Sequence, residues 1–250
     1  MKKKSLLVFL ALLLPILPFW VMTATTCAMA GETLNATLAQ MPIYAISPTE
    51  GVEVNFVQAI SRVSGVPITI SVNPFPRSMS YVTQEPIRAD FHIPLIKNDI
   101  IPEDKLPYYY SEETIFHVNF TIYSLKGKDV NKDNLSKFKV ETDAAHVGYF
   151  PFKAIPSNSI EQSLEKVSAG RIDAFVFADN ATDPVLKKLG LHNIKRTLYK
   201  RFDVKIILPK TERGKQVDKI LSAAIEKMRQ TGEFQKIQGP IDMPYDDWQP

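Results

Sequence analysis

The sequence predicts an α/β protein of two lobes, each a sheet flanked by helices, joined by two crossover strands. Gly170–Asp179 (GRIDAFVFAD) reads as the exit of a helix, a polar turn and a strand that is apolar on both faces. A weaker copy of this pattern precedes it at Arg88–Leu95. Strands of this kind lie in sheets that helices cover. Two copies therefore indicate two similar lobes, with a cleft between them where a small ligand can bind.

Two alternating runs provide the crossover strands. Phe116–Leu125 alternates apolar and polar residues over a length that can leave one lobe and enter the next, and Asp203–Pro209 alternates in the same way. These runs set the predicted domain boundaries. Residues 31–120 plus 207–250 form lobe 1, and residues 121–206 form lobe 2.

Residues 1–30 have the composition of a cleavable signal peptide. Three lysines follow Met1, Leu6–Met22 is apolar, and Ala28–Ala30 has the small-x-small form of a signal-peptidase site. An uncleaved membrane anchor is the alternative, which two prolines in the apolar run disfavour. Cys27 is a candidate for lipidation, although the two threonines before it fit that signal badly. We expect export to the periplasm and removal of this segment.

Removal of the signal peptide leaves a neutral chain without cysteine. The full sequence has 30 basic and 27 acidic residues, and the signal peptide holds three lysines and no acid, so 27 of each remain. Phosphate binding needs a positive excess, so nucleic acid is not an expected partner. Cys27 is the only cysteine, which excludes disulfides and thiol chemistry in the mature chain. A chain of this length can bury a full core without such links.

Lobe 1 begins with a strand, a helix and a second strand. Leu34–Ala45 reads as the strand and its exit loop, and Tyr44 stands where the strand opens. Val52–Ser64 places apolar residues on one helical face and ends at Gly65. Pro67–Val72 alternates with β-branched residues, which predicts the second strand.

The segment Pro74–Met79 follows the second strand and begins a short helix near Arg77. The carboxyl end of a strand faces the mouth of a cleft in α/β folds. There Arg77 can grip a carboxylate or phosphate through two parallel hydrogen bonds, and Phe75 can form an apolar wall. A surface arginine and a core phenylalanine explain the same residues equally well, so both interpretations stay open.

Aromatic residues follow the third strand, which we predict at Ala89–Ile96. Three tyrosines precede Ser111. Tyr110 and Ser111 are candidates for the cleft lining, and packing inside the lobe is the alternative. His117 stands alone in an alternating run, a pattern more typical of a hydrogen-bonded structural residue than of a ligand.

The turn Asp143–Tyr149 is the first candidate site of lobe 2. It follows a strand predicted at Phe138–Val140, and its backbone N–H groups can hold an anionic group. We expect the side chains of Asp143 and His146 to face the cleft.

Asp179 is the second candidate in lobe 2. A helix with its capping residue at Ser159 leads to the strand Ala174–Phe177, and Asp179 stands near the carboxyl end of that strand. Asp179 can accept a hydrogen bond from a ligand ammonium or hydroxyl, or it can cap the helix predicted at Thr182–Leu189. Both roles stay open.

The C-terminal region predicts a short strand, the second crossover and an amphipathic helix. Asn193–Tyr199 is the short strand, and Val217–Met228 carries an apolar helical stripe that ends before Gly232. Tyr245–Trp248 closes the chain, with Trp248 packed on the surface.

In this order of elements the chain resembles the bacterial extracellular solute-binding proteins of family 3, the polar amino acid type. The resemblance covers essentially the whole mature chain. It rests on the export signal, the GRIDAF stretch, the crossover near Val204 and the segment Glu212–Ile237 with its TGEFQKI ending. It implies a two-lobed periplasmic-binding-protein fold of type II that closes on its ligand like a hinge. It also implies a monomer that delivers a small solute to an inner-membrane ABC permease or a sensor.

The resemblance also implies ligand-binding residues. Phe75 and Arg77 fall on the Pro-aromatic-x-Arg-small-Leu/Met motif of one subgroup, and Asp143–Gly148 falls on the anion-binding turn of the family. Asp179 falls near the aspartate that usually meets an α-ammonium, with a spacing one residue longer. Members that bind α-amino acids carry an arginine where this chain has Pro102–Lys105. An ordinary α-amino acid ligand would therefore require Arg77 to replace that arginine.

We expect a binding protein that captures an amino-acid-like or organic-acid solute between its lobes. One alternative is a carboxylate-based, dehydratase-like enzyme on the same fold that uses Glu112, Asp143 and Asp179. Another is a periplasmic interaction protein whose cleft has lost its ligand. The four histidines lack metal-ligand spacing and no phosphate loop or nucleophile motif occurs, so no cofactor or metal is expected. The predicted ligand-binding residues are Tyr44, Phe75, Arg77, Tyr110, Ser111, Asp143, His146 and Asp179.

Overall fold

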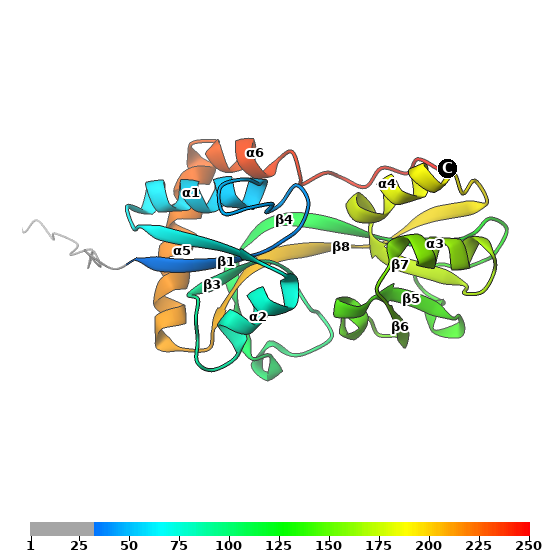
Figure 1. The fold of residues 1–250 in the computed structure, drawn as a ribbon, viewed down its shortest axis with the longest axis horizontal. Helices are drawn as coiled ribbons and strands as arrows, with labels where there is room; N and C mark the ends of the chain where they lie inside the picture. The colour runs from blue at the N-terminus through cyan, green and yellow to red at the C-terminus, as the bar shows by residue number, and fades with distance from the viewer. Residues whose placement is uncertain (1–32) are drawn as a thin grey trace, which may run out of the picture. The chain divides into compact units, whose positions relative to one another are not determined.

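Residues 33–250, which the computed structural model describes, form one mixed sheet of eight strands in the order β2-β1-β3-β8-β4-β7-β5-β6 (Figure 1). The predicted signal peptide, residues 1–30, lies outside the described residues. The strands are β1 (Leu34–Ala39), β2 (Ile68–Asn73), β3 (Phe91–Ile96), β4 (Tyr108–Leu125), β5 (Val140–Asp143), β6 (Ala154–Ser157), β7 (Ala174–Ala178) and β8 (Ile194–Pro209).

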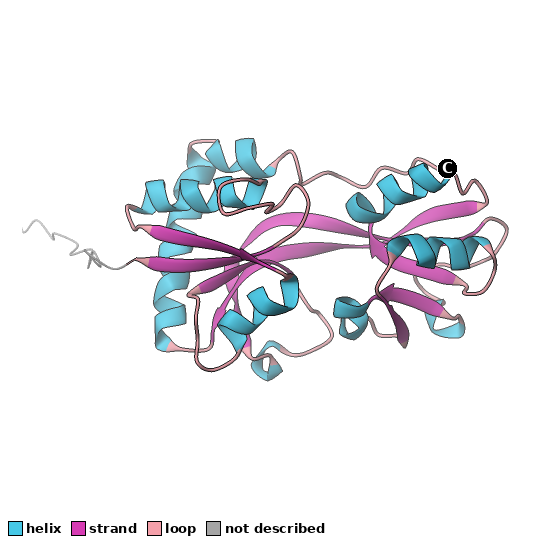
Figure 2. Ribbon diagram, viewed as in Figure 1, coloured by secondary structure: helices cyan, strands magenta, loops and turns pink. Residues whose placement is uncertain are grey.

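Helices connect these strands and cover the sheet (Figure 2). The α-helices are α1 (Val52–Ser64), α2 (Phe75–Thr83), α3 (Ile160–Ser168), α4 (Asp179–Leu189), α5 (Glu212–Gln230) and α6 (Glu233–Gln238). The short 3-10 helices are η1 (Glu103–Lys105), η2 (Leu135–Lys137) and η3 (Ala144–Tyr149). Within residues 33–250, none of these helices combines the length and the apolar character needed to cross a membrane.

Strands β4 and β8 pair antiparallel and extend through both lobes. Strand β3 joins β8 at residues 204–207, and β7 joins β4 at residues 120–124. Lobe 1 thus carries β1 to β3 with α1, α2, α5 and α6, and lobe 2 carries β5 to β7 with α3 and α4. The predicted two-lobed α/β class with two crossover strands is confirmed, and the sheet is continuous through both lobes. The boundaries at residues 120/121 and 206/207 stay a prediction and fall inside β4 and β8.

Both crossover strands are longer than the sequence pattern indicates. Strand β4 begins at Tyr108 rather than at Phe116, and β8 unites the predicted short strand Asn193–Tyr199 with the predicted crossover. Lys200 and Arg201 are exposed in the middle of β8. These two charged residues interrupt the apolar alternation, which is why one strand reads as two in the sequence.

The repeated strand pattern corresponds to strands that are buried on both faces. All six residues of β3 are buried, and in β7 only Phe177 is partly exposed. Phe91 and Ile93 of β3 pack with Phe56 of α1 in the main apolar core. Because helices cover both faces, such strands need no polar alternation.

One acidic side chain, Glu53 of α1, is enclosed in lobe 1. The residue has no exposed surface, Gln238 Nε2 donates to its Oε2 at 3.4 Å, and its Oε1 has no hydrogen-bond partner among the described residues. Burial raises the pKa of Glu53 to about 8, and the hydrogen bond from Gln238 opposes this only in part. Glu53 is therefore mostly protonated at neutral pH.

We expect Glu53→Gln to raise the free energy of unfolding, by a margin that grows with pH. The glutamate ionises near pH 4.5 in the unfolded chain, whereas the folded protein holds its proton up to about pH 8. The contribution of Glu53 to stability is thus fully present below pH 4.5 and is lost as the pH rises through about 8. The margin should grow by up to about 1.4 kcal/mol per pH unit in this window.

Urea unfolding at several pH values across this window measures the margin. Glu226→Gln, on the exposed face of α5, is the matched control and should show no such trend. A margin for Glu53→Gln that does not change with pH would contradict a protonated Glu53.

Residues 240–250, here called the C-terminal strap, run without helix or strand from α6 toward α4 (Figure 1). The strap is hydrogen-bonded to both crossover strands. His117 Nδ1 of β4 donates to Asp242 Oδ1 at 3.0 Å. The side chain of Gln249 accepts from the backbone N of Arg196 at 2.9 Å and donates to its carbonyl at 3.0 Å. The strap is therefore a third connection from lobe 1 to lobe 2.

Arg196 of β8 anchors the strap to α4. Its side chain has no exposed surface, and its Nε donates to Asp183 Oδ1 at 2.8 Å. Its Nη1 donates to the carbonyl oxygens of Asp246 at 2.9 Å and of Trp248 at 2.6 Å, and its guanidinium carbon lies 4.4 Å from the centroid of a Trp248 ring. Trp248 is consequently half-buried and packs against the core of lobe 2.

We expect Arg196→Met to lower the free energy of unfolding by about 3 to 5 kcal/mol, because Asp183 would lose its buried counter-charge. The strap should also become a site of cleavage in limited proteolysis. Lys126→Met is the matched control, because Lys126 is exposed and its ammonium donates to a single described group, Pro250 O at the end of the strap. A loss for Arg196→Met no larger than that of the control would show that the arginine does not anchor the strap.

Candidate functional site

Loops that leave the strands of the two lobes meet in the cleft between them. Tyr44 follows β1, and its hydroxyl oxygen accepts a hydrogen bond from Asn180 in the first turn of α4. Asn98 follows β3, and its Nδ2 donates to the carbonyl of Gly148 in η3 at 3.2 Å. Each of these hydrogen bonds joins lobe 1 to lobe 2. The cleft is therefore closed in this structure.

The imidazole of His146 fills the centre of the cleft. Its ring centroid lies 6.5 Å from that of Phe75 in lobe 1 and 5.4 Å from that of Phe177 in lobe 2. The ring of Phe120 on β4 lies 5.6 Å away, edge-on. Only 16% of the His146 side chain is exposed. The structure thus brings together two predicted site residues, Phe75 and His146, which come from different lobes.

Asp143 orients His146. The Nδ1–H of His146 donates to Asp143 Oδ1 at 3.0 Å, and the backbone N of Ala145 donates to the same oxygen at 2.9 Å. Burial acts to raise the pKa of Asp143, but these hydrogen bonds outweigh it and the pKa is lowered. Asp143 is therefore an ionised carboxylate at neutral pH, and it holds the imidazole toward the rings of the cleft.

Three tyrosine side chains extend this contact between the lobes. The hydroxyl oxygens of Tyr108 and Tyr110 in β4 lie 3.3 Å apart, and the hydroxyl of Tyr149 from η3 interacts with both. Burial raises the pKa of all three. Tyr110 also accepts from the backbone N of Asn98 at 3.0 Å. Tyr110 therefore joins the packing of lobe 1 to η3, and its hydroxyl is already occupied by protein groups.

Arg77 and Ser111 lie apart from the central ring cluster. Arg77 is exposed on α2, and its guanidinium has no ion pair or hydrogen bond among residues 33–250. Ser111 is buried, and its Oγ accepts from the backbone N of Glu113 at 3.3 Å. The structure therefore leaves Arg77 available to an anion and encloses Ser111 in lobe 1.

A hydrogen-bonded chain that sequence reasoning missed lies beneath Phe75. Ser78 Oγ is 2.7 Å from His92 Nδ1 and 2.9 Å from Thr37 Oγ1, and all three residues are fully buried. Burial lowers the pKa of His92 to about 3, so its imidazole is neutral. Phe75 stands edge-on to this imidazole at 5.7 Å between ring centroids. The chain provides a partner for Nδ1 of the buried histidine in β3 and supports the position of Phe75.

A cavity of about 500 Å³, here called the strap cavity, opens between the lobes beneath the C-terminal strap. Its lining includes Tyr44 from lobe 1, Asp179 and Asn180 from α4, and Asn119 from β4. This volume is in the range of small-molecule sites. The remaining lining residues are Ile43, His117, Val118, Asp183, Pro184, Lys187, Arg196, Pro240, Ile241, Met243, Pro244, Asp246 and Trp248.

Asp179 is the first residue of α4, which begins three residues earlier than the sequence pattern indicates. Its Oδ2 accepts from Asn119 Nδ2 at 3.1 Å, and its Oδ1 accepts from the backbone N of Asn180 at 2.7 Å. Burial raises the pKa of Asp179 despite these hydrogen bonds. Ala178 occupies the N-cap position of α4 and no side chain forms a capping hydrogen bond there, so Asp179 does not cap the helix. Asp179 lines the strap cavity, and its role as a ligand-binding residue stays a prediction.

Tyr44 closes the other side of the strap cavity. Its ring stacks on Phe116 with centroids 5.4 Å apart, and burial raises the pKa of its hydroxyl to about 12. The loop that carries Tyr44 returns at Gly51, where φ is 137° and a Cβ atom would lie 2.3 Å from Tyr44 O. Only glycine fits this approach, so Gly51 helps to fix the Tyr44 backbone.

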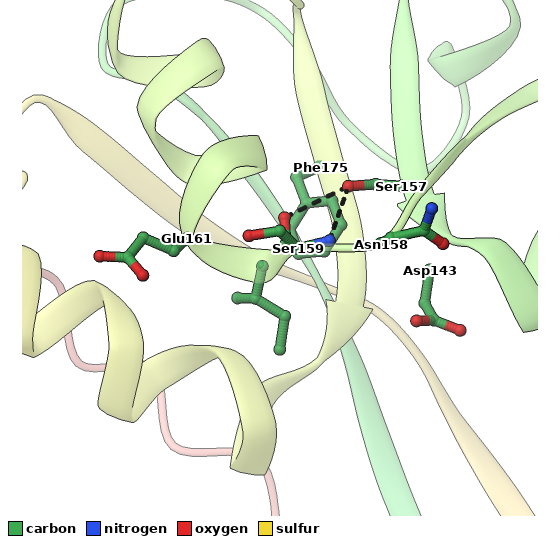
Figure 3. Close-up of a pocket in the computed structure, with 7 residues that line it drawn as sticks. Asp143, Ser157, Asn158, Ser159, Glu161 and Phe175 are labelled. Carbon is green, nitrogen blue, oxygen red and sulfur yellow. Dashed lines mark hydrogen bonds between the residues drawn. The ribbon is translucent and has the colours of Figure 1, made fainter. Parts of the chain in front are cut away.

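A second cavity of about 380 Å³ lies at the carboxyl ends of β5 and β6 (Figure 3). Asp143 and Glu161 lie on opposite sides of it in Figure 3. Ser157 Oγ donates to Ser159 O at 3.2 Å, and Ser159 caps α3 by accepting from Gln162 N at 3.2 Å, as the capping pattern predicts. Two carboxylates make this lining unfavourable for an anion.

No protein-family model matches the chain, and no curated protein matches it in sequence. Solved structures match its fold. A histidine kinase sensor domain with similarity to periplasmic binding proteins is 16% identical, with a TM-score of 0.62, over 83% of this chain and 95% of its own. The GluR0 ligand-binding core from Nostoc punctiforme, in complex with L-glutamate, is 16% identical, with a TM-score of 0.60, over 82% and 96%. An ancestral arginine-binding protein bound to arginine is 18% identical, with a TM-score of 0.57, over 83% and 97%.

At these identities the likeness shows the fold. The chain has the two-lobed fold of type II periplasmic binding proteins. The fold that the resemblance implied is therefore confirmed. The three structures named above are a sensor domain and two proteins that hold an amino acid.

We expect His146→Ala to let the lobes separate, because the contact of η3 with Phe75 would be lost. Spin labels on cysteines introduced at Lys105 in lobe 1 and Lys153 in lobe 2 can report this in a protein of residues 31–250, which contain no cysteine. The mean distance between the labels should lengthen by about 3 Å or more, as hinge opening requires. His192→Ala, on the exposed surface of lobe 2, is the control. An unchanged distance in His146→Ala would show that the His146 ring does not hold the cleft closed, because the hydrogen bond from Asn98 to Gly148 of η3 remains in this variant.

Proposed function

We propose that the chain is a periplasmic solute-binding protein that captures a small polar solute between its lobes and passes it to an ABC permease or a sensor. The fold supports this, because structures of the same fold include proteins that hold amino acids and a sensor domain. The composition of residues 1–30 supports export.

One observation carries the proposal: polar groups from both lobes line the same cavity. Tyr44 belongs to lobe 1, and Asp179 and Asn180 belong to lobe 2. A ligand that contacts both lobes binds the closed form better than the open form, and that difference in affinity drives hinge closure. The raised pKa of Asp179 supports a functional role, because desolvated carboxylates are common at binding sites.

The enzyme alternative has less support. Of its three candidate carboxylates, Glu112 is exposed on β4, Asp143 is paired with His146, and Asp179 lines the strap cavity. Within residues 33–250, no hydrogen bond joins any two of these carboxylates. Among residues 33–250, no cluster of histidine, aspartate and glutamate side chains could hold a metal ion.

The interaction-protein alternative is favoured by a different observation. The cleft centre is filled by the ring of His146 between Phe75, Phe120 and Phe177. A cleft filled by its own side chains would suit a protein that no longer binds a solute there. The screen described next separates this alternative from solute binding.

A thermal-shift screen of residues 31–250 against amino acids, amines, organic acids and small peptides tests the proposal. A ligand at about 100 times its Kd should stabilise the protein by roughly 2.7 kcal/mol. That corresponds to a rise of roughly 5 to 10 °C in Tm for a chain of this size. One chemically coherent group of hits would support solute binding. No hit across the whole library would favour the interaction protein.

A further inference from the structure

Asp179 lines the strap cavity, and its carboxylate forms no ion pair with any described residue. Its contacts are the amide of Asn119 and the backbone N of Asn180, and it forms no ion pair within residues 33–250. The other two carboxylates of the lining differ from it. Asp183 is paired with Arg196, and Asp246 is exposed to water. A bound cation would therefore find its counter-charge at Asp179.

The cations of the lining are already in use or lie at its rim. The guanidinium of Arg196 already donates hydrogen bonds to Asp183 and to two carbonyl oxygens of the strap. Lys187 is exposed, with its Nζ 4.3 Å from the centroid of a Trp248 ring. An ammonium of this kind is no bidentate partner for a carboxylate. The strap cavity thus lacks a buried, available arginine for the carboxylate of an amino acid.

The rest of the wall is largely apolar. Tyr44 and Trp248 contribute aromatic rings, and Val118 contributes an aliphatic group from β4. Four further apolar side chains come from the strap: Pro240, Ile241, Met243 and Pro244. Such a wall favours a ligand with a hydrocarbon or aromatic body.

We propose that the strap cavity binds a primary amine that has an apolar body and no carboxylate. The ammonium would lie against Asp179, and the body would pack between Tyr44 and the strap. An amino acid of the same shape would also bring a carboxylate into the cavity. The cavity has no available arginine to donate two parallel hydrogen bonds to that carboxylate, so the amino acid should bind more weakly. This inference rests on the proposed function and names the class of solute.

Isothermal titration of residues 31–250 with a matched set of three compounds tests the ligand class. Phenethylamine has only the ammonium, phenylalanine has both charged groups, and 3-phenylpropionate has only the carboxylate. We expect phenethylamine to bind, phenylalanine to bind at least about tenfold more weakly, and 3-phenylpropionate to give no heat of binding.

Asp179→Asn tests the residue. It should weaken phenethylamine at least about tenfold, with circular dichroism and Tm confirming that the variant folds. Asp247→Asn removes the same charge from an exposed position of the strap outside the cavity lining, and it should leave the affinity unchanged. Equal loss in the two variants, or no loss in Asp179→Asn, would overturn the assignment of Asp179.

The pH dependence supplies a second readout. An amine stays protonated on acidification, whereas Asp179 takes up a proton above the ordinary aspartate pKa of 3.8 because burial raises its pKa. Affinity should therefore fall as the pH approaches that range, and Asp179→Asn should abolish this fall. Because His117 also lines the cavity, a fall that persists in Asp179→Asn would assign the dependence elsewhere and count against the proposal. The ionisable groups that act on Asp179 are Tyr44, Tyr123, Asp183, Arg196 and Tyr245.

Failure of this inference can be told apart from failure of the proposed function. If amino acids or organic acids bind and amines of any shape do not, the ligand class is wrong and solute binding stands. If no compound of the whole library binds, both are wrong.

Discussion

The antiparallel pairing of β4 with β8 is the constraint on which the rest of the structure depends. Strand β3 of lobe 1 pairs with β8, and strand β7 of lobe 2 pairs with β4, so the lobes attach to opposite edges of the pair. The two attachments also lie at different positions along the strands. Any movement of one lobe against the other must therefore bend the pair. The register of the pair shifts between Phe120 and Thr121, and Lys200 and Arg201 are exposed opposite this point. A bulged and solvated segment bends more readily than a regular, buried one, so the position of a hinge is built into these strands.

The C-terminal strap adds a second constraint at the same place. It is hydrogen-bonded to His117 on β4 and to Arg196 on β8, so it accompanies the crossover strands from one lobe to the other. Two partly buried acidic side chains near the strap differ in their partners. Asp183 has a buried arginine partner, which makes it part of the scaffold, whereas Asp179 has only neutral hydrogen-bond donors. A desolvated carboxylate without a counter-charge lowers the stability of the empty protein, and a bound cation can recover that loss.

The ring cluster around His146 makes closure compatible with an empty cleft. Aromatic and apolar side chains supply much of the contact across the cleft, and Asn98 and the tyrosine hydroxyls satisfy the polar groups there. A ligand at the centre of the cleft would have to displace His146 and would lose the stabilisation of its ring contacts. A ligand in the strap cavity would not, because that cavity is already open beneath the strap. For this reason the strap cavity is a better site for a first ligand than the centre.

Local sequence patterns determined much of the architecture: the strands apolar on both faces, the helices with their stops at Gly65 and Gly170, and the two-lobed class. These features depend on neighbours along the chain, where periodicity and turn residues are visible. Contacts between side chains that are far apart in the sequence could not be predicted from these local patterns. Asp179 and Asp183 lie on one helix and look alike in sequence, yet Arg196 pairs with only one of them. Tyr44 and Asp179 share a cavity while Arg77 and Ser111 lie elsewhere, because the pairing of β4 with β8 and the path of the strap decide which strand ends meet.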